Sequence, residues 1–172
     1  MHIRDLFDLH GKVAIVTGGG RGLGEQLAEA LAEAGADLLL CSRKVEACAE
    51  VADRITAATG VKAVAMSCDI VQPDDVARVV DRAMAEFGRI DILVNNSGAT
   101  WGAPAVDMPL EAWRKVIDTN VTGTFLMSQA VGRVMIQQGG GKIINIASTA
   151  VLAVSIPGSW MLLATTRAKV PF

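Results

Sequence analysis

Eight residues near the start of the chain form a turn that is suited to holding phosphate. Residues 17–24 read Thr-Gly-Gly-Gly-Arg-Gly-Leu-Gly, and the positions with candidate roles are Thr17, Gly18, Arg21, Gly22, Leu23 and Gly24. Glycine accepts positive φ and lets a pyrophosphate come within hydrogen-bonding distance of backbone N–H groups. An apolar segment at 13–16 precedes the turn, and a helix is expected to begin near Leu23 with its positive end at the turn. This strand–turn–helix order predicts a dinucleotide-binding site.

Polar residues also follow each later apolar segment. They are Ser42 and Arg43, Asp69 with Ile70 beside it, Asn96, Ser97 and Gly98, and Ser148. Ligands of open α/β sheets bind beyond the carboxyl ends of the strands, so we expect these residues to share one site with the glycine turn. Each has a plainer alternative on its own: Asp69 could cap a loop, Asn96 could serve a turn, and Ser148 could be a turn hydroxyl.

The elements that must position these residues alternate between strand and helix. Strands are expected at 13–16, 38–41, 61–67, 90–94 and 142–147, and helices between them at about 23–34, 45–58, 73–87 and 110–137. This order predicts an α/β fold, a Rossmann-like doubly wound parallel sheet with helices on both faces. Asn120 falls inside the last predicted helix, where asparagine is locally unfavourable, which indicates a tertiary role.

Composition narrows the class of protein. The chain has 172 residues, 51% of them hydrophobic, which fits one domain with a strand core covered on both faces. Its net charge of −2 argues against a nucleic-acid partner, and no apolar run is long enough to cross a membrane. The amino terminus lacks a signal-peptide pattern, and the three cysteines lack metal-ligand or C-x-x-C spacing. We therefore expect reduced thiols in a cytoplasmic protein that holds no metal.

Taken together in order and spacing, these motifs resemble the short-chain dehydrogenase/reductase family over residues 9–157. The resemblance implies that Asp69 hydrogen-bonds the adenine, with a backbone group of Ile70 beside it, and that the loop at 95–98 lines the adenine ribose. In that loop Ser97 replaces the family's alanine. The resemblance also makes Asn120 and Ser148 catalytic: Asn120 would anchor a water of the proton relay, and Ser148 would hydrogen-bond the substrate carbonyl or hydroxyl.

The choice of cofactor depends on the residues at the end of the second predicted strand. An acidic side chain there would pair with the ribose hydroxyls of NAD and repel a 2′-phosphate. The sequence instead has Ser42, Arg43 and Lys44 at this point, and Arg21 in the glycine turn can add a second guanidinium. These charges favour NADP over NAD, although Arg43 and Lys44 could also be solvated charges that open a helix.

The family's proton donor, a tyrosine in a Y-x-x-x-K motif, has no counterpart because the sequence contains no tyrosine. Thr165 and Lys169 keep the spacing, but threonine is far too weak an acid to replace a phenol with a pKa of about 10. We therefore expect a partial cofactor-binding domain at 1–157, incomplete at its carboxyl end, and an aberrant tail at 158–172. Permitted codons for the tail, reread in another frame, encode Y-x-x-x-K. A frameshift near residues 157–159 is our hypothesis for its origin.

The function implied by the resemblance is hydride transfer between NAD(P) and a small-molecule alcohol or ketone. The segment at 99–105 resembles gluconate 5-dehydrogenases, which suggests a sugar acid such as gluconate or 5-ketogluconate as substrate. Without the tyrosine, this chain is expected to be inactive. A non-catalytic nucleotide-binding module and a non-functional fragment are the alternatives. Members of the family are usually homo-oligomers, but the helices of their main interface lie beyond the resemblance, so the assembly of this chain stays open.

Overall fold

The computed structural model describes residues 6–147. Ser148 and the segment at 158–172 lie outside these residues, so the expectations for them are not addressed by the structure. Within the described residues, no helix is both long and apolar enough to span a bilayer.

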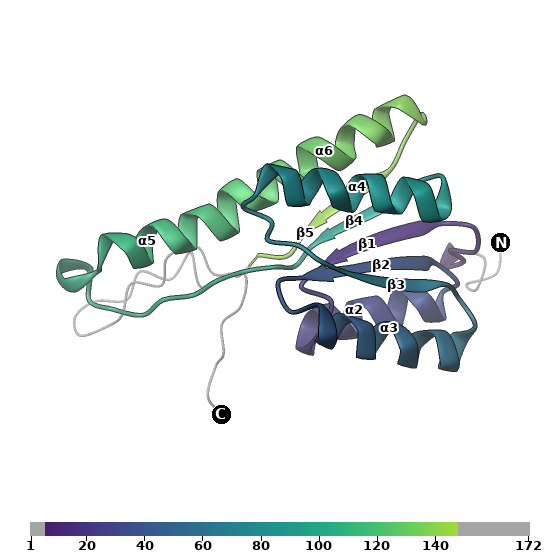
Figure 1. The fold of residues 1–172 in the computed structure, drawn as a ribbon, viewed down its shortest axis with the longest axis horizontal. Coiled ribbons are helices and arrows are strands. Elements are labelled where there is room, and N and C mark those ends of the chain that lie inside the picture. Colours follow the sequence, from purple (N-terminus) through teal and green to yellow (C-terminus); the bar gives the residue numbers. More distant parts are fainter. Residues whose placement is uncertain (1–5, 148–172) are drawn as a thin grey trace.

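A five-stranded parallel sheet forms the centre of the molecule, with strand order β3-β2-β1-β4-β5 (Figure 1). The strands are β1 (Val13–Thr17), β2 (Asp37–Ser42), β3 (Ala63–Ser67), β4 (Ile92–Asn95) and β5 (Lys142–Asn145). The chain runs outward from β1 to β3 and then returns to place β4 on the other side of β1. The sheet is therefore doubly wound, as predicted, and its switch point lies between β1 and β4.

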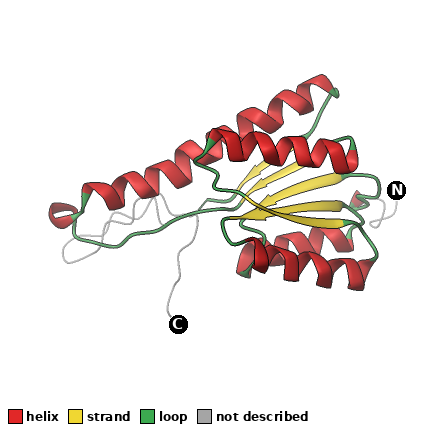
Figure 2. Ribbon diagram, in the orientation of Figure 1, coloured by secondary structure: helices red, strands yellow, loops and turns green. Residues whose placement is uncertain are grey.

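Helices cover both faces of the sheet (Figure 2). On one face lie α2 (Gly22–Glu33) and α3 (Val45–Thr59). On the other lie α4 (Pro73–Phe87) and α6 (Thr124–Gln137), while α5 (Leu110–Ile117) extends past the sheet. The short η1 (Ala105–Asp107) precedes α5, and η2 (Asp118–Gly123) joins α5 to α6.

The core forms two layers because alternate strand residues point to opposite faces. Ile15, Leu39 and Leu93 pack with α4 and α6, whereas Leu38 and Leu40 pack with α2 and α3. All five are fully buried. This burial on both faces explains why the strands read as continuous apolar runs in the sequence.

The long helix expected at 110–137 is divided in the structure. Residues 118–123 form a π-helical segment, η2, between two α-helical stretches. Such segments are frequent at functional sites, and this one contains Asn120. The strands differ from the expected ranges at their ends: β3 begins at Ala63, β4 at Ile92, and β5 ends at Asn145.

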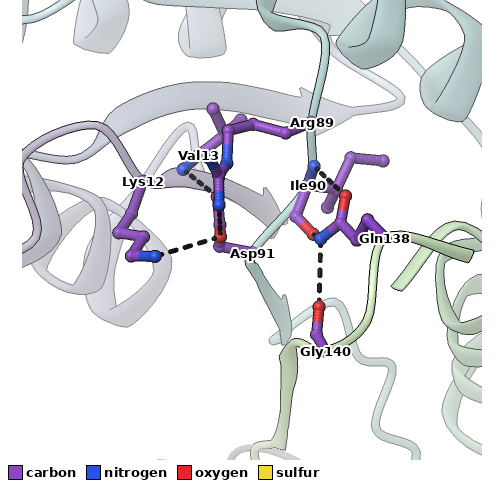
Figure 3. A network of polar contacts seen from close by, with 7 residues as sticks. All are labelled: Lys12, Val13, Arg89, Ile90, Asp91, Gln138 and Gly140. Carbon is purple, nitrogen blue, oxygen red and sulfur yellow. Dashed lines mark hydrogen bonds and ion pairs between the residues drawn. The ribbon is translucent and has the colours of Figure 1, made fainter. Parts of the chain in front are cut away.

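A polar network ties the amino ends of the strands together, away from the glycine turn (Figure 3). Asp91 Oδ2 accepts hydrogen bonds from Val13 N at 3.0 Å and from Arg89 Nε at 2.7 Å. Its Oδ1 accepts from Arg89 Nη2 at 2.6 Å and lies 3.5 Å from Lys12 Nζ. Beside it, the Gln138 side chain bonds both backbone groups of Ile90, which joins the end of α6 to the start of β4.

Candidate cofactor-binding site

A hollow of about 360 Å³ lies at the carboxyl ends of the strands, where the loops after β1 and β4 diverge toward opposite faces of the sheet. The chain segments that follow β1, β2, β3 and β4 contribute to its wall, together with one residue each from α3 and η2. The lining residues are Gly18, Gly20, Arg21, Ser42, Arg43, Lys44, Ala47, Cys68, Asp69, Ile70, Asn96, Ser97, Gly98 and Thr119. This is the position at which doubly wound sheets bind ligands.

The glycine turn has a backbone that other residues would not adopt without strain. Gly18 and Gly22 have φ of +67° and +54°. A Cβ on Gly24 would lie 2.2 Å from Gly18 O and 2.5 Å from Asn96 Nδ2, far inside contact distance. Glycine at these positions therefore lets the start of α2 lie directly against the loops after β1 and β4, and leaves a cradle open to a phosphate.

Thr17 lies beneath the hollow and holds its two central loops together. Its Oγ1 accepts hydrogen bonds from Asn96 N at 3.0 Å and Ser97 N at 2.9 Å, and donates toward Val94 O at 3.4 Å. The side chain is fully buried. In return, Asn96 Nδ2 donates to Thr17 O at 3.1 Å and Gly18 O at 3.3 Å. Thr17 and Asn96 therefore fix the glycine turn against the loop after β4.

Positive charge gathers on the side of the hollow next to β2. This strand ends at Ser42, and Arg43 and Lys44 follow as exposed residues that line the hollow. The Ser42 hydroxyl donates to Lys44 O at 2.7 Å and so sets the turn that presents both cations. Asp37, the acidic residue of β2, stands at the opposite end of the strand, where it accepts from Lys62 N at 2.8 Å.

Asp69 caps its loop and also lines the hollow. Its Oδ1 accepts a hydrogen bond from Val71 N at 3.4 Å, which is the loop-capping role, while the residue also lines the hollow. Asp69 N donates to Asp75 Oδ2 at 2.8 Å, and this bond lowers the pKa of Asp75. Asp75, in the first turn of α4, thereby anchors the loop that forms this wall.

Asn120 connects the π-helical segment to the loop after β4. Its Oδ1 accepts from Ala99 N at 2.8 Å, and its Nδ2 donates to Ala99 O at 2.9 Å. This two-point contact gives the tertiary reason for an asparagine within the helix. Thr119, the preceding residue, lines the hollow.

Nine of the predicted site residues line the hollow: Gly18, Arg21, Ser42, Arg43, Asp69, Ile70, Asn96, Ser97 and Gly98. The others stand near it in different ways. Thr17 lies below it, and the Asn120 side chain hydrogen-bonds Ala99 in the loop after β4. Gly22, Leu23 and Gly24 form the start of α2 beside it. Ser148 lies outside the described residues.

Four lining residues were not singled out from the sequence: Gly20, Ala47, Cys68 and Thr119. Lys44, whose charge the sequence analysis used for the choice of cofactor, also lines the hollow, and Gly20 is a neighbour of predicted residues that loop continuity could have indicated. Ala47 and Thr119 lie on helices, and which side of a helix meets a distant loop depends on tertiary packing. Cys68 directly precedes Asp69 and is buried.

The three cysteines are free thiols buried in the described residues, as the sequence predicted. A hydrogen bond with Cys68 and burial raise the pKa of Cys41 well above its usual value, and burial raises that of Cys48. Buried thiols with raised pKa values are poor nucleophiles, so Cys41 and Cys48 act as packing residues here.

The geometry fits a dinucleotide. The glycine cradle that a Cβ would fill has backbone N–H groups suited to a pyrophosphate, and the Asp69–Ile70 and 96–98 loops line the same hollow. A nicotinamide dinucleotide supplies the hydride when bound. The residues of this chain would hold the phosphates, enclose the adenosine and, through the Asn120 contact to Ala99, fix the loop beside the reacting end.

Comparison with known proteins agrees with this geometry. The profile of the family described as short chain dehydrogenase matches residues 12–159. D-threitol dehydrogenase of Mycolicibacterium smegmatis is 41% identical over 144 residues, covering 84% of this chain and 55% of the relative. The 2-dehydro-3-deoxy-D-gluconate 5-dehydrogenase of Escherichia coli is 42% identical over 147 residues, covering 85% of this chain and 57% of the relative.

A solved short-chain type dehydrogenase/reductase from Mycobacterium marinum superposes with a TM-score of 0.87 at 44% identity, covering 94% of this chain and 63% of that one. A 7α-hydroxysteroid dehydrogenase complexed with NADH superposes with a TM-score of 0.85 at 36% identity, covering 91% and 60%. This chain thus spans a little over half the length of the relatives it matches. It belongs to the short-chain dehydrogenase family.

Proposed function

We propose that this chain binds NADP(H) in the hollow at the β1–β4 switch point, as the cofactor-holding part of an alcohol/ketone oxidoreductase. The hollow itself carries the proposal, because it joins a glycine cradle to two loops that could enclose an adenosine. NAD(H) is the alternative cofactor, since a family relative was solved with NADH.

The charges around the hollow support the preference for NADP(H). Arg21, Arg43 and Lys44 all line it, and a guanidinium or ammonium beside the ribose would pair with a 2′-phosphate. Asp37 cannot oppose that phosphate, because it stands at the other end of β2.

A polyol or sugar acid is the proposed substrate class. The relatives described above include a threitol dehydrogenase and a dehydrogenase of a deoxygluconate. A second, smaller hollow of about 190 Å³ lies between the loop after β4 and α5, and Trp101, Glu111 and Lys115 contribute to its wall. An aromatic face with charged groups beside it suits a hydroxylated carbon chain, and Trp101 stands two residues from the Ala99 that Asn120 holds.

We further propose that this 172-residue chain binds the cofactor without completing the reaction. It contains no tyrosine to serve as the family's proton donor. The alternatives are that the chain is not part of an enzyme: a non-catalytic nucleotide-binding module or a non-functional fragment. The frameshift near residues 157–159 stays a proposal, in keeping with a family match that ends at residue 159. We place the protein in the cytoplasm, which suits its three free thiols.

The binding proposal is tested by titrating the chain with NADPH and NADH and following cofactor fluorescence. NADPH should bind more tightly. Arg43→Ala should weaken NADPH binding about tenfold, because one charge-assisted contact is lost, and leave NADH binding nearly unchanged. Arg114→Ala, which removes a cation in α5 outside the lining of the hollow, is the matched control. Equal losses for both cofactors would contradict the 2′-phosphate assignment.

Turnover separates the remaining alternatives. The chain should bind NADPH but show no oxidation of threitol or gluconate and no reduction of the matching ketones. Binding without turnover is the result expected both of the proposed cofactor-holding part and of a nucleotide-binding module, which the coding DNA then separates, and neither binding nor turnover supports a non-functional fragment. Measurable turnover would show that the tyrosine is not required. Sequencing the coding DNA decides the frameshift, which is excluded if the alternative frame lacks the tyrosine codon.

A further inference from the structure

A carboxylate of the chain already accepts a hydrogen bond from a backbone amide at the edge of the glycine cradle. Glu25 lies in the first turn of α2, and its Oε2 accepts a hydrogen bond from Gly22 N at 3.1 Å. Gly22 is the first residue of α2, so its N–H is one of the donors that the helix itself leaves without an acceptor. These donors and the positive helix end are the features that attract a pyrophosphate to such a turn.

A second helix holds this carboxylate in place. Arg54 of α3 forms an ion pair with Glu25 Oε1 and a second one with Glu29 Oε1 at 3.0 Å. Glu25 is therefore fixed from two sides, by the Gly22 amide and by a guanidinium, and its side chain is only 29% exposed. One positive charge is shared between two carboxylates, so this group of three side chains keeps a net charge of −1 next to the cradle.

We propose that Glu25 is an internal competitor of the cofactor pyrophosphate. It satisfies the Gly22 amide while the cradle is empty and must yield when a dinucleotide binds, and its charge opposes the incoming phosphates. Arg54 limits this opposition by neutralising part of the charge. The inference rests on the proposed binding of a dinucleotide, and it adds a residue that sets how tightly the cofactor is held.

The expected size of the effect follows from the charges. Two unit charges about 4 Å apart in a well-solvated site interact by an amount equivalent to about fivefold in affinity. The effect should fall on ligands that carry a pyrophosphate and spare ligands that carry only the adenosine side. It should also shrink at high salt, because Glu25 is partly exposed.

Glutamine at position 25 isolates the charge. Glu25→Gln keeps an oxygen that can accept from Gly22 N, so the helix cap survives while the charge is lost. In calorimetric titrations of the full 172-residue chain, this variant should bind NADPH about fivefold more tightly than the unmodified chain. Its affinity for adenosine 2′-phosphate, which lacks the pyrophosphate, should stay the same.

Two further variants serve as a matched control and an opposite change. Glu29→Gln removes a carboxylate that shares Arg54 but makes no contact with Gly22, so it should change NADPH affinity less than twofold. Arg54→Gln leaves the charge of Glu25 without its partner and should weaken NADPH binding. Because Arg54 is 53% exposed, its loss should leave the fold intact, which thermal unfolding checks for every variant.

The outcomes separate this inference from the function on which it rests. If the unmodified chain binds NADPH and Glu25→Gln binds it no more tightly, Glu25 is only a helix cap and the inference fails alone. A gain that is equally large for adenosine 2′-phosphate also overturns it. If neither the unmodified chain nor Glu25→Gln binds a dinucleotide, the proposed function fails and the inference fails with it.

Discussion

Thr17 shows how one hydroxyl can organise a site that it does not line. Its Oγ1 accepts from two consecutive amides, Asn96 N and Ser97 N, at the point where the chain leaves β4. Both amides face the oxygen of a fully buried side chain, so water could not readily replace that oxygen as their acceptor. The loop that flanks the hollow therefore depends on this residue for its backbone position.

Thr17→Val should destabilise the fold by about 2–4 kcal/mol, because it keeps the shape of the side chain but leaves two amides without an acceptor. The free energy of unfolding in urea measures this loss. Thr17→Ser, which keeps the hydroxyl, is the control and should retain most of the stability that Thr17→Val loses. An equal loss in both variants would contradict this assignment to the hydroxyl, because Thr17→Ser keeps the hydroxyl.

Among the elements, the π-helical segment is packed unusually closely against the hollow. A Cβ on Gly123, the last residue of η2, would lie 2.6 Å from Ile70 Cγ1 and 3.2 Å from Ile70 O. Ile70 lines the hollow, so the segment sets the position of one wall. Elsewhere in the same long helix, a Cβ on Gly132 would meet nothing within 4 Å.

These two glycines provide a matched pair of variants. Gly123→Ala should destabilise the fold by about 1–3 kcal/mol through overpacking, and it should weaken cofactor binding by displacing Ile70. Gly132→Ala should instead stabilise it by about 0.4–1 kcal/mol, since alanine restricts the unfolded chain and favours helix. Urea unfolding and NADPH titration of both variants check the pair. If Gly123→Ala proved as harmless as Gly132→Ala, the position of Ile70 would not depend on its close contact with Gly123.

The other end of the sheet depends on the carboxylate of Asp91, whose side chain is only 12% exposed. Burial raises its pKa, but hydrogen bonds from Arg89 and Val13 N and the charges of Arg89 and Lys12 outweigh that effect, so the net shift is downward. A lowered folded-state pKa means that the carboxylate stabilises the fold above the unfolded-state value of about 3.9. This contribution is lost as the pH falls through the folded-state pKa.

Asp91→Asn should therefore cost about 1–3 kcal/mol at neutral pH, because the ion pairs that bridge the strand ends are lost. The difference from the unmodified chain should begin to narrow as the pH falls below about 4, the pKa of an aspartate in the unfolded chain, and should be lost once the pH passes the lower folded-state pKa. Urea unfolding over a range of pH values measures it. Asp81→Asn, at an exposed position of α4, is the control and should show little difference at any pH. A difference independent of pH would mean that the charge of Asp91 is unimportant.

At the scale of the whole molecule, β3 and β5 are the edge strands of the sheet among residues 6–147, and β5 is the one that exposes large apolar side chains. The strand β5 pairs only with β4 there, and Ile143 and Ile144, which point to opposite faces, are 39% and 46% exposed. An open edge with apolar side chains is a template for strand pairing between molecules.

We expect this edge to drive association of the chain. Sedimentation velocity should show a size that increases with protein concentration, and Ile144→Lys should reduce the increase because a charged edge resists pairing. Ile136→Lys, on an exposed site of α6, is the control for added charge alone and should have a smaller effect. A size independent of concentration in the unmodified chain would contradict this expectation.

The order of elements and the family were accessible from the sequence because they depend on local patterns. Continuous apolar runs marked the buried strands, and Gly18, Gly22 and Gly24 marked a turn that only glycine can make. The position of each polar residue after a strand then predicted one shared site. Nine of the residues predicted for the site, polar or not, line one hollow, because parallel strands bring their carboxyl ends to the same edge.

Tertiary structure alone decided which side chains hold the loops and which lie open to a ligand. The sequence assigned Thr17 to the cofactor, but its hydroxyl is buried and turned toward two amides 79 and 80 residues away in the chain. It placed Asn120 in a helix without indicating the π-helical turn that lets the side chain reach Ala99. Local patterns fix strands and turns, whereas a hydrogen bond between distant loops exists only once packing has brought them together. For the same reason, the contact of Arg54 with Glu25 at the edge of the cradle could be found only in the folded chain.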